Sequence, residues 1–489
     1  MEMLNKSLGE LSEALTSRAI SSEEITKACL KHVASCDTKL GSMLWIDEEK
    51  ALEEARASDL RRSKNQACGV LDGVPLSIKD MILCKGLPAT AASKILEGYM
   101  PCYEATVIEK LRSEGAVVLG KANQDEFAMG SSNESSAYKI CKNPYDHEYT
   151  PGGSSGGSAA SVSAGMCFGS LGTDTGGSIR QPAAFCGVVG VKPSYGRVSR
   201  FGVIAFASSL DQVGPLTRTV RDSALLLRAI AGHDPRDATS VREPVPDYVS
   251  GLNLDLKNKK IGVPREYFAA GISESVKASL MRSIDILRQE GAEIVDISLP
   301  HTPYAVATYY IIAAAEASSN LSKYDGIRFG PRVGDNADLL SLYELTRGEL
   351  FGDEVKRRIM LGTFVLSAGH FDAYYVRAQK VRRLFANDFA EAFKKVDVII
   401  SPTTPTTAFK IGEKIGDPVS MYLNDIYTIS ANLAGLCSIS LPSGLDNLGL
   451  PIGTQLMARP FDEQGLFNIA AALEAGLAFK QRPLELCHE

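Results

Sequence analysis

The chain lacks the features by which several classes of protein are recognised. Its 489 residues carry a formal net charge of −6, which argues against a protein that holds nucleic acid by its own electrostatics. Its ten cysteines form no C-x-x-C pair and no cluster with histidine, so neither a zinc site nor a disulfide framework is indicated. Free thiols fit a reducing compartment. No G-x-x-x-x-G-K-[ST] loop for nucleotide phosphates occurs either.

Long apolar segments are missing as well. The longest apolar run, Tyr304–Ala315, ends at Glu316 and is too short to span a bilayer. Met1–Leu15 is amphipathic and charged, without the apolar core of a signal peptide. We therefore expect a cytoplasmic protein that makes no contact with a membrane.

Helical and strand patterns alternate along the chain. The first sixty residues are expected to be helical, with a capping box at Ser21 and Glu24 and a second helix near Glu48–Arg61. Later helices are predicted at Ala105–Glu114, Thr219–Ile230, Ser273–Gln289, most of Tyr304–Arg382, and Gly465–Ala478. Strands are predicted at Val74–Ile78, Ala116–Leu119, Lys260–Val263, Ala292–Ile297 and Val396–Ile400. This alternation predicts an α/β fold with a substantially parallel sheet.

The sequence offers no stretch with the length or polarity of an interdomain linker. Its 45% hydrophobic content supports a substantial core. We therefore expect one domain over residues 1–489. It comprises an N-terminal helical segment (1–65), a core (66–220) and a remainder with further strands and a helical insertion (221–489).

Two turns rich in glycine and serine, Gly152–Ser158 and Gly172–Ser178, enclose a compact segment. Glycine allows close approach of backbones and conformations that other residues resist. Such turns can place hydroxyls among exposed backbone N–H groups, as needed to attack a carbonyl and hold the resulting oxyanion. A flexible linker is the ordinary meaning of this composition. Ala159–Leu171, between the turns, is apolar or small instead of solvating, which argues against a linker.

Two other motifs overlap these turns. Gly153–Gly157 fits G-x-S-x-G, which would make Ser155 the nucleophile of an α/β-hydrolase elbow. That mechanism needs a later histidine, and none of the available ones has an informative context: His233, His301 and His370. Asp174–Gly176 resembles the triplet of aspartic proteases, which need two carboxylates sharing a proton. No second triplet occurs, so that interpretation is excluded.

Lys79 follows an alternating pattern of apolar residues, Val74, Leu76 and Ile78. A strand with this pattern places Lys79 on the face opposite these three. A lysine that closes an apolar strand is most often a solvated end, and beside Asp80 it could form a surface ion pair. The residues around Lys79 alone leave these alternatives open.

Lys79, Gly152–Ser158 and Gly172–Arg180 together resemble the amidase signature family. Its members hydrolyse amides with a Ser–Ser–Lys triad on a mixed sheet covered by helices. The segments that appear in the family's order and spacing cover most of the first half: Leu71–Asp80, Gly120–Ser132, Asn143–Ser158, Gly172–Arg180 and Val191–Pro215. The resemblance implies a large mixed, mostly parallel, twisted sheet with helices on both faces.

By position, the resemblance implies that Ser178 is the nucleophile, Ser154 the bridging serine and Lys79 the base. A serine hydroxyl attacks well only when a neighbouring group takes its proton. Lysine has a reference pKa of about 10.4, so burial or nearby cations must make it neutral before it can act as a base. Ser154 would pass the proton from Ser178 to Lys79 and return one to the leaving ammonia, whose departure forms an acyl-enzyme.

The same resemblance implies two features of the backbone. The peptide bond at the bridging serine is cis in the family. The N–H groups of Thr175, Gly176 and Gly177 would form the oxyanion hole, helped by the dipole of a helix that opens near Ser178.

Gly120–Ser132 and Tyr195–Pro215 look most like the branch of the family that supplies ammonia to tRNA-dependent amidotransferases. Glutamine carries an α-carboxylate and an α-ammonium, so a site that selects it needs one cation and one anion. The resemblance implies that Arg358 binds the carboxylate and Asp425 the amino group. It also implies a pocket lining of Tyr309, Gly130 and Ser131. The alternative for Arg358 is the solvated face of a helix of mixed charge.

The chain departs from the family pattern at three places outside the triad. Ala122 and Gln124 stand where Thr and Met are expected, and Cys437–Ser438 replaces Pro-Ala. These departures leave the expected reaction unchanged.

The resemblance implies partners as well as a substrate. Glutamine would be hydrolysed here, with no metal or cofactor held by this chain. Two further subunits, B and C, would complete a heterotrimer, in which a partner uses ATP and Mg²⁺ to activate Glu-tRNA(Gln), or Asp-tRNA(Asn), and contacts the tRNA. One alternative is a stand-alone amidase for a small aliphatic or aromatic amide. Another is a non-catalytic scaffold, against which the intact triad argues.

Overall fold

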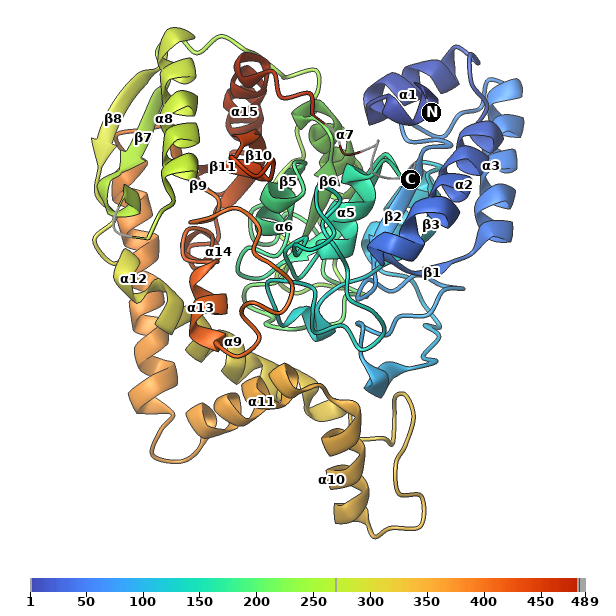
Figure 1. The fold of residues 1–489 in the computed structure, drawn as a ribbon, viewed down its shortest axis with the longest axis vertical. Coiled ribbons are helices and arrows are strands. Elements are labelled where there is room, and N and C mark those ends of the chain that lie inside the picture. Colours follow the sequence, from blue (N-terminus) through green and yellow to red (C-terminus); the bar gives the residue numbers. More distant parts are fainter. Residues whose placement is uncertain (1, 269–270, 482, 484–489) are drawn as a thin grey trace.

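A computed structural model describes residues 2–268, 271–481 and 483. Eleven strands of this part of the chain form one sheet, in the order β1-β3-β2-β4-β6-β5-β10-β11-β9-β7-β8. The strands are β1 (Met43–Ile46), β2 (Pro75–Lys79), β3 (Val117–Ala122), β4 (Gly169–Asp174), β5 (Val189–Lys192), β6 (Gln212–Thr217), β7 (Lys260–Pro264), β8 (Glu293–Ile297), β9 (Val398–Pro402), β10 (Cys437–Leu445) and β11 (Pro451–Ala458). Figure 1 shows the sheet running through the upper body of the molecule.

Helices surround this sheet. The α-helices are α1 (Leu8–Thr16), α2 (Ser22–Leu40), α3 (Glu48–Ser63), α4 (Thr106–Ser113), α5 (Gly156–Ser163), α6 (Arg180–Phe185), α7 (Val220–Ile230), α8 (Glu274–Gln289), α9 (Ala305–Asn320), α10 (Leu339–Leu350), α11 (Asp353–Leu366), α12 (Arg377–Ala392), α13 (Pro418–Leu423), α14 (Ile429–Leu433) and α15 (Glu463–Leu477). The predicted capping box is present at the start of α2, where Ser21 and Glu24 bond reciprocally.

The helices cover both faces of the sheet, as predicted. An added Cβ at Gly453 of β11 would lie 2.4 Å from Ala184 of α6. The next residue, Thr454, has its hydroxyl 3.1 Å from that of Ser283 in α8. Because successive residues of a strand point to opposite faces, α6 and α8 lie on opposite sides of β11.

The mixed sheet is confirmed, but the expectation that it is mostly parallel was wrong. Four pairings are parallel, β2 with β3 and β4, and β7 with β8 and β9. Six pairings are antiparallel. Each of these six includes a strand that periodicity did not reveal: β1, β5, β6, β10 or β11. The expectation of an all-helical N-terminus was wrong at β1 for the same reason.

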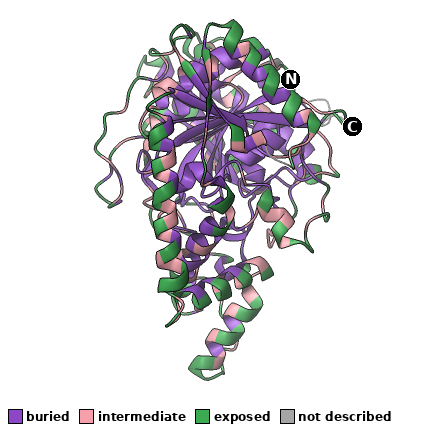
Figure 2. Ribbon diagram, turned by 90° about the vertical axis from the view of Figure 1, so that its left-hand side faces the viewer, coloured by how far each residue is buried: buried purple, intermediate pink, exposed green. Residues whose placement is uncertain are grey.

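Most of the apolar run Tyr304–Ala315 is buried, although Tyr304 at its start is exposed. Most of it belongs to α9, where Ile312, Ala313, Ala314 and Ala315 are buried. No helix in the described part of the chain is long and apolar enough to cross a membrane. In Figure 2 buried residues fill the sheet and the inner sides of its helices, whereas α10 projects from the body and is largely exposed.

The topology brings the two Gly/Ser turns to one place. β2 and β4 are parallel neighbours, with Ile78 opposite Leu171. Lys79 and Asp174 therefore close adjacent strands at the same edge of the sheet. The first turn leads into α5, which packs against β4. The carboxyl ends of these two strands are where the candidate site lies.

Candidate active site

Lys79 is fully buried at the end of β2. Its Nζ lies 2.7 Å from Ser154 Oγ, 2.9 Å from Ser155 Oγ and 2.8 Å from Thr173 Oγ1. Both alternatives left open by the sequence are thereby excluded, because this lysine is neither a solvated strand end nor the partner of Asp80. The Asp80 carboxylate instead lies 3.5 Å from Lys121.

Two of the three hydroxyls around Lys79 have their protons committed elsewhere. Ser155 Oγ donates to the carbonyl of Thr173 (3.1 Å), and Thr173 Oγ1 donates to the Met81 sulfur (3.1 Å). Both oxygens therefore accept from Lys79. A neutral amine has two N–H bonds and one lone pair, so with Lys79 neutral the lone pair faces Ser154.

The charge state of Lys79 follows from its surroundings. Burial lowers the pKa of Lys79 to about 7, although the carboxylates of Asp125, Asp174 and Asp211 act in the opposite direction. A large fraction of this lysine is therefore neutral near pH 7. A lysine needs this property to act as a base at that pH.

The first turn holds Ser154 through its backbone. The Gly153–Ser154 peptide bond is cis, as the family resemblance implied. A Cβ at Gly153 would lie 1.9 Å from Asp125 Oδ2, so the contact requires glycine at this position. The N–H of Asp125 donates to Ser154 O (3.2 Å), and the N–H of Gly153 donates to Gln181 Oε1 (2.8 Å).

Ser178 lies beside this turn, where the N–H of Ser155 donates to Ser178 O (3.1 Å). Ser178 retains 8% exposure, whereas Lys79 and Ser154 are fully buried. The Oγ of Ser178 makes no hydrogen bond among the described residues. The hydroxyl is thus the one of the three that a substrate can reach.

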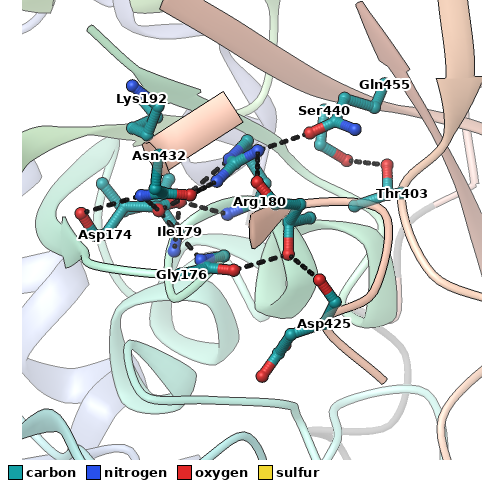
Figure 3. Close-up of polar contacts among 12 residues, drawn as sticks. Asp174, Gly176, Ile179, Arg180, Lys192, Thr403, Asp425, Asn432, Ser440 and Gln455 are labelled. Carbon is teal, nitrogen blue, oxygen red and sulfur yellow. Dashed lines mark hydrogen bonds and ion pairs between the residues drawn. The ribbon is translucent and has the colours of Figure 1, made fainter. Parts of the chain in front are cut away.

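Asp174 folds the second turn into a closed loop (Figure 3). Its carboxylate accepts from the N–H groups of Gly177 (2.9 Å) and Ile179 (3.2 Å), and it forms a buried ion pair with Arg180 (3.0 Å). Asn432 donates to the same carboxylate (2.8 Å). Burial alone would raise the pKa of Asp174, but Arg180 holds it at about 2. Asp174 is therefore a fixed anion that shapes the loop.

The predicted oxyanion donors occupy this loop, and two of them remain free of internal partners. The N–H of Gly177 is taken by Asp174, whereas the described hydrogen bonds leave the N–H groups of Thr175 and Gly176 unused. The Thr175 hydroxyl donates to Asp211 (2.6 Å), and Thr428 donates to the carbonyl of Gly176 (2.6 Å). The nearby helix, α6, begins at Arg180 and has six residues.

Three of the predicted substrate-binding residues, Gly130, Ser131 and Arg358, line a cavity of about 240 Å³. The other two border it indirectly. Asp425 accepts a hydrogen bond from Ser131 Oγ (2.6 Å). The ring of Tyr309 covers Gly176, where an added Cβ would lie 2.6 Å from Tyr309 Cζ. The cavity lies near the lower end of the volume range of small-molecule sites.

Arg358 is buried, with 4% exposure, so the alternative of a solvated helix face was wrong. Its Nε donates to Glu354 Oε1 (2.8 Å), one turn earlier in α11. The guanidinium also lies over the rings of Phe206, Tyr310 and Tyr422, at 5.1 to 5.5 Å from their centroids. Burial works against its charge, but Tyr310 and Glu354 hold the pKa of Arg358 above its usual range. Of these partners, only the i,i+4 spacing of Glu354 was visible in the sequence.

Asp425 has a different environment. Burial raises the pKa of Asp425 to about 7, although Ser131 and Arg358 lower it. The site thus places a permanent cation and a titratable anion around one cavity.

The histidines needed for a hydrolase elbow lie elsewhere. His301 binds Asp388 (2.8 Å), His370 binds Ser367 (3.1 Å), and His233 binds the carbonyl of Ser240 (3.1 Å). Ser155 contacts Lys79 and Thr173 instead. Among the described residues, no group of three or more His, Cys, Asp or Glu side chains could hold a metal ion.

Comparisons with known proteins agree with this geometry. A family model described as Amidase matches residues 24–467. The chain is 56% identical over 485 residues to the A subunit of glutamyl-tRNA(Gln) amidotransferase of Anaeromyxobacter sp. (strain K), with 99% of each chain covered. The crystal structure of the same subunit from Thermotoga maritima is similar at 44% identity and a TM-score of 0.80, with 96% of this chain and 95% of that one covered. Native peptide amidase from Stenotrophomonas maltophilia is similar at 30% identity and a TM-score of 0.82, with 98% of each chain covered.

Proposed function

The chain belongs to the amidase signature family, and we propose that it is the glutaminase subunit of a tRNA-dependent amidotransferase. The observation that carries this function is similarity along the whole chain to relatives named as the A subunit of glutamyl-tRNA(Gln) amidotransferase. The protein hydrolyses glutamine to glutamate. The ammonia released converts Glu-tRNA(Gln) to Gln-tRNA(Gln), or Asp-tRNA(Asn) to Asn-tRNA(Asn), in a partner subunit.

In the proposed reaction, Ser178 Oγ attacks the side-chain amide carbon of glutamine. The Ser178 proton passes to Ser154, whose own proton goes to the lone pair of neutral Lys79, 2.7 Å away. Negative charge develops on the amide oxygen, which the free N–H groups of Thr175 and Gly176 bind, while the N–H of Gly177 stays bonded to Asp174 and holds the loop in place. The carbon–nitrogen bond then breaks as the proton returns through Ser154 to the leaving ammonia. Water hydrolyses the resulting ester at Ser178 and releases glutamate.

Substrate selection is assigned to the cavity beside this triad. Arg358 would bind the α-carboxylate of glutamine, and Asp425 the α-ammonium, with Gly130, Ser131 and Tyr309 around them. Support comes from the burial of Arg358 and Asp425, because a buried charged group binds its counter-ion more strongly than an exposed one. Glu354 engages only Nε of the guanidinium, which leaves its two terminal nitrogens for a carboxylate.

The remaining assignments concern the assembly. We propose that this chain works in the cytoplasm with subunits B and C, and that ATP, Mg²⁺ and the aminoacyl-tRNA are bound by a partner. We also propose that residues 1–489 form one amidase domain. Segments 1–65, 66–220 and 221–489 each contribute strands to the one sheet, which supports that assignment.

A stand-alone amidase is the second candidate, favoured by the similarity to peptide amidase. The two candidates differ in what the purified protein does. We expect the chain to co-purify with two further subunits, and the complex to form Gln-tRNA(Gln) or Asn-tRNA(Asn) from glutamine, ATP and the misacylated tRNA. A chain that purifies alone, ignores glutamine and hydrolyses a short aliphatic amide would be the stand-alone enzyme.

A further inference from the structure

Glu126 is a buried acid outside the triad and outside the proposed contacts to glutamine. It has 2% exposure and lies in the 3-10 turn η3 (Glu126–Ala128), just before Gly130 and Ser131. Its carboxylate accepts the N–H of Gly352 at both oxygens, at 3.2 and 2.9 Å, and also the hydroxyl of Ser93. A buried carboxylate is costly unless its hydrogen bonds are satisfied, so its partners show what it does.

Gly352 is the N-cap residue of α11, the helix that carries Glu354 and Arg358. No side chain of α11 caps this end, so Glu126 supplies the cap from a distant segment. The approach is close, because a Cβ at Gly352 would lie 2.2 Å from Glu126 Oε2. The carboxylate therefore joins the first turn of α11 to the segment that lines the cavity.

A second anchor holds the other end of the same helix. Gly362 lies directly against α9, where an added Cβ would be 1.9 Å from the carbonyl oxygen of Ala314. Arg358 lies between these two anchors, six residues after Gly352 and four before Gly362. Loss of the Glu126 contact would release the first turn of α11 while the helix stays packed on α9 around Gly362, and a tilt of that turn would move Arg358 with it.

General packing does not require a charge at this position. Phe127, which follows Glu126, packs edge-on against Phe351, which precedes Gly352, with ring centroids 5.7 Å apart. The two segments are therefore already in apolar contact beside the Glu126–Gly352 hydrogen bond. The carboxylate adds direction, because it accepts the N–H of Gly352 at the point where α11 begins.

We propose that Glu126 is a positioning residue that sets the place of the Arg358 guanidinium relative to Gly130 and Ser131, and thereby the affinity for the α-carboxylate of glutamine. This inference rests on the proposed function of Arg358. Glu126 itself touches neither the triad nor the cavity in the contacts of the described residues.

The test measures kcat and KM of the purified complex on glutamine and on propionamide, which lacks the α-groups. We expect Glu126→Ala to raise KM for glutamine about ten-fold while kcat and the constants for propionamide stay nearly unchanged. Glu126→Gln should recover most of the affinity, because its oxygen can accept from Gly352 and its NH₂ can donate to Ser93. Glu349→Ala is the matched control: it removes an exposed acid three residues before Gly352, at a position that does not line the cavity, and should change neither constant.

Gly352→Ala gives an independent test that does not remove the acid. The added methyl displaces the carboxylate and should raise KM for glutamine, but in the Glu126→Ala background it should add nothing. Equal losses on both amides, or a fall in kcat alone, would show that Glu126 merely supports the fold. If Arg358→Ala raises KM for glutamine and Glu126→Ala does not, this inference is wrong and the proposed function stands. If Arg358→Ala leaves KM unchanged, the proposed role of Arg358 fails, and this inference with it.

Discussion

Lys79 Nζ and Ser154 Oγ lie 2.7 Å apart, and Ser154 is the only one of the three hydroxyls around Lys79 whose proton has no other acceptor among the described residues. Ser155 and Thr173 act as fixed acceptors that orient the amine. A proton can therefore reach the lysine only through Ser154. This asymmetry separates the two neighbouring serines of the first turn and agrees with the bridging role that the family resemblance implied for Ser154.

The first prediction follows from that asymmetry. Ser178→Ala should lower glutamine hydrolysis by about 10⁶-fold and abolish the acyl adduct, because the attacking oxygen is gone. Ser155→Ala should cost only about ten-fold, the worth of one hydrogen bond that orients Lys79. Mass spectrometry of the trapped adduct should locate it on Ser178 in the parent and in Ser155→Ala. An adduct on Ser155 would instead support the hydrolase-elbow interpretation.

The second prediction concerns the charge of Lys79. If it acts as a neutral base, Lys79→Arg should be nearly as inactive as Lys79→Ala, because guanidinium stays protonated at working pH. The ratio of kcat between the two variants measures this directly. An arginine variant that keeps a substantial share of parent activity would mean that Lys79 contributes only positive charge.

The third prediction is the pH dependence. Because burial lowers the pKa of Lys79 to about 7, the neutral form that accepts a proton predominates above that pH. We expect kcat to rise with pH through about 7 and then to level off. Asp425, with a pKa of about 7, must be charged to bind the ammonium group, so it should add a second dependence to kcat/KM for glutamine.

The variant Asp425→Asn separates these two titrations. It should remove the contribution of Asp425 from kcat/KM and leave the rise in kcat intact. A kcat that falls above pH 7 would show that the protonated form of Lys79 is the active one.

The fourth prediction tests substrate recognition. Arg358→Ala and Asp425→Ala should each lower kcat/KM for glutamine by about ten- to a hundred-fold, since a hydrogen bond to a charged group contributes about 1.5–3 kcal/mol. Propionamide has no α-groups and should lose much less. Steady-state kinetics on both amides give the comparison. Equal losses on the two substrates would mean that these residues only maintain the fold.

The sequence predicted five of the six strands that form parallel pairs, all except β4, and none of the five strands that form only antiparallel pairs. β2, β3, β7, β8 and β9 carry continuous or alternating apolar residues, and each was predicted. β6 (Gln212–Thr217) contains Gly214 and Pro215, residues that are typical of turns. Gly214 is there because the neighbouring strand approaches closely, with Val191 O only 2.0 Å from where its Cβ would be. Such tertiary contacts leave no periodic signal.

The site shows the same division. The residues of the two Gly/Ser turns and Lys79 could be assigned from motifs whose order along the chain is specific. The contacts that support them could not, because they join distant segments: Asn432 donates to Asp174 across 258 residues, and Gly352 to Glu126 across 226. No local pattern marks such a pair. An acid beside a functional motif, such as Glu126 before Gly130 and Ser131, is the one sequence signal of such a contact.

The last prediction concerns Gln124, one of the departures from the family pattern. Its side chain is fully buried, and neither its oxygen nor its nitrogen has a hydrogen-bond partner among the described residues. Gln124→Met should therefore raise the free energy of unfolding by about 1–3 kcal/mol, because the desolvation cost of the amide is removed. The equally buried Gln455 is the matched control, since its amide bonds Ser401, Tyr427 and Arg180, and Gln455→Met should destabilise. Urea unfolding of both variants measures the change in the free energy of unfolding. A destabilised Gln124→Met would mean that an internal partner satisfies this amide.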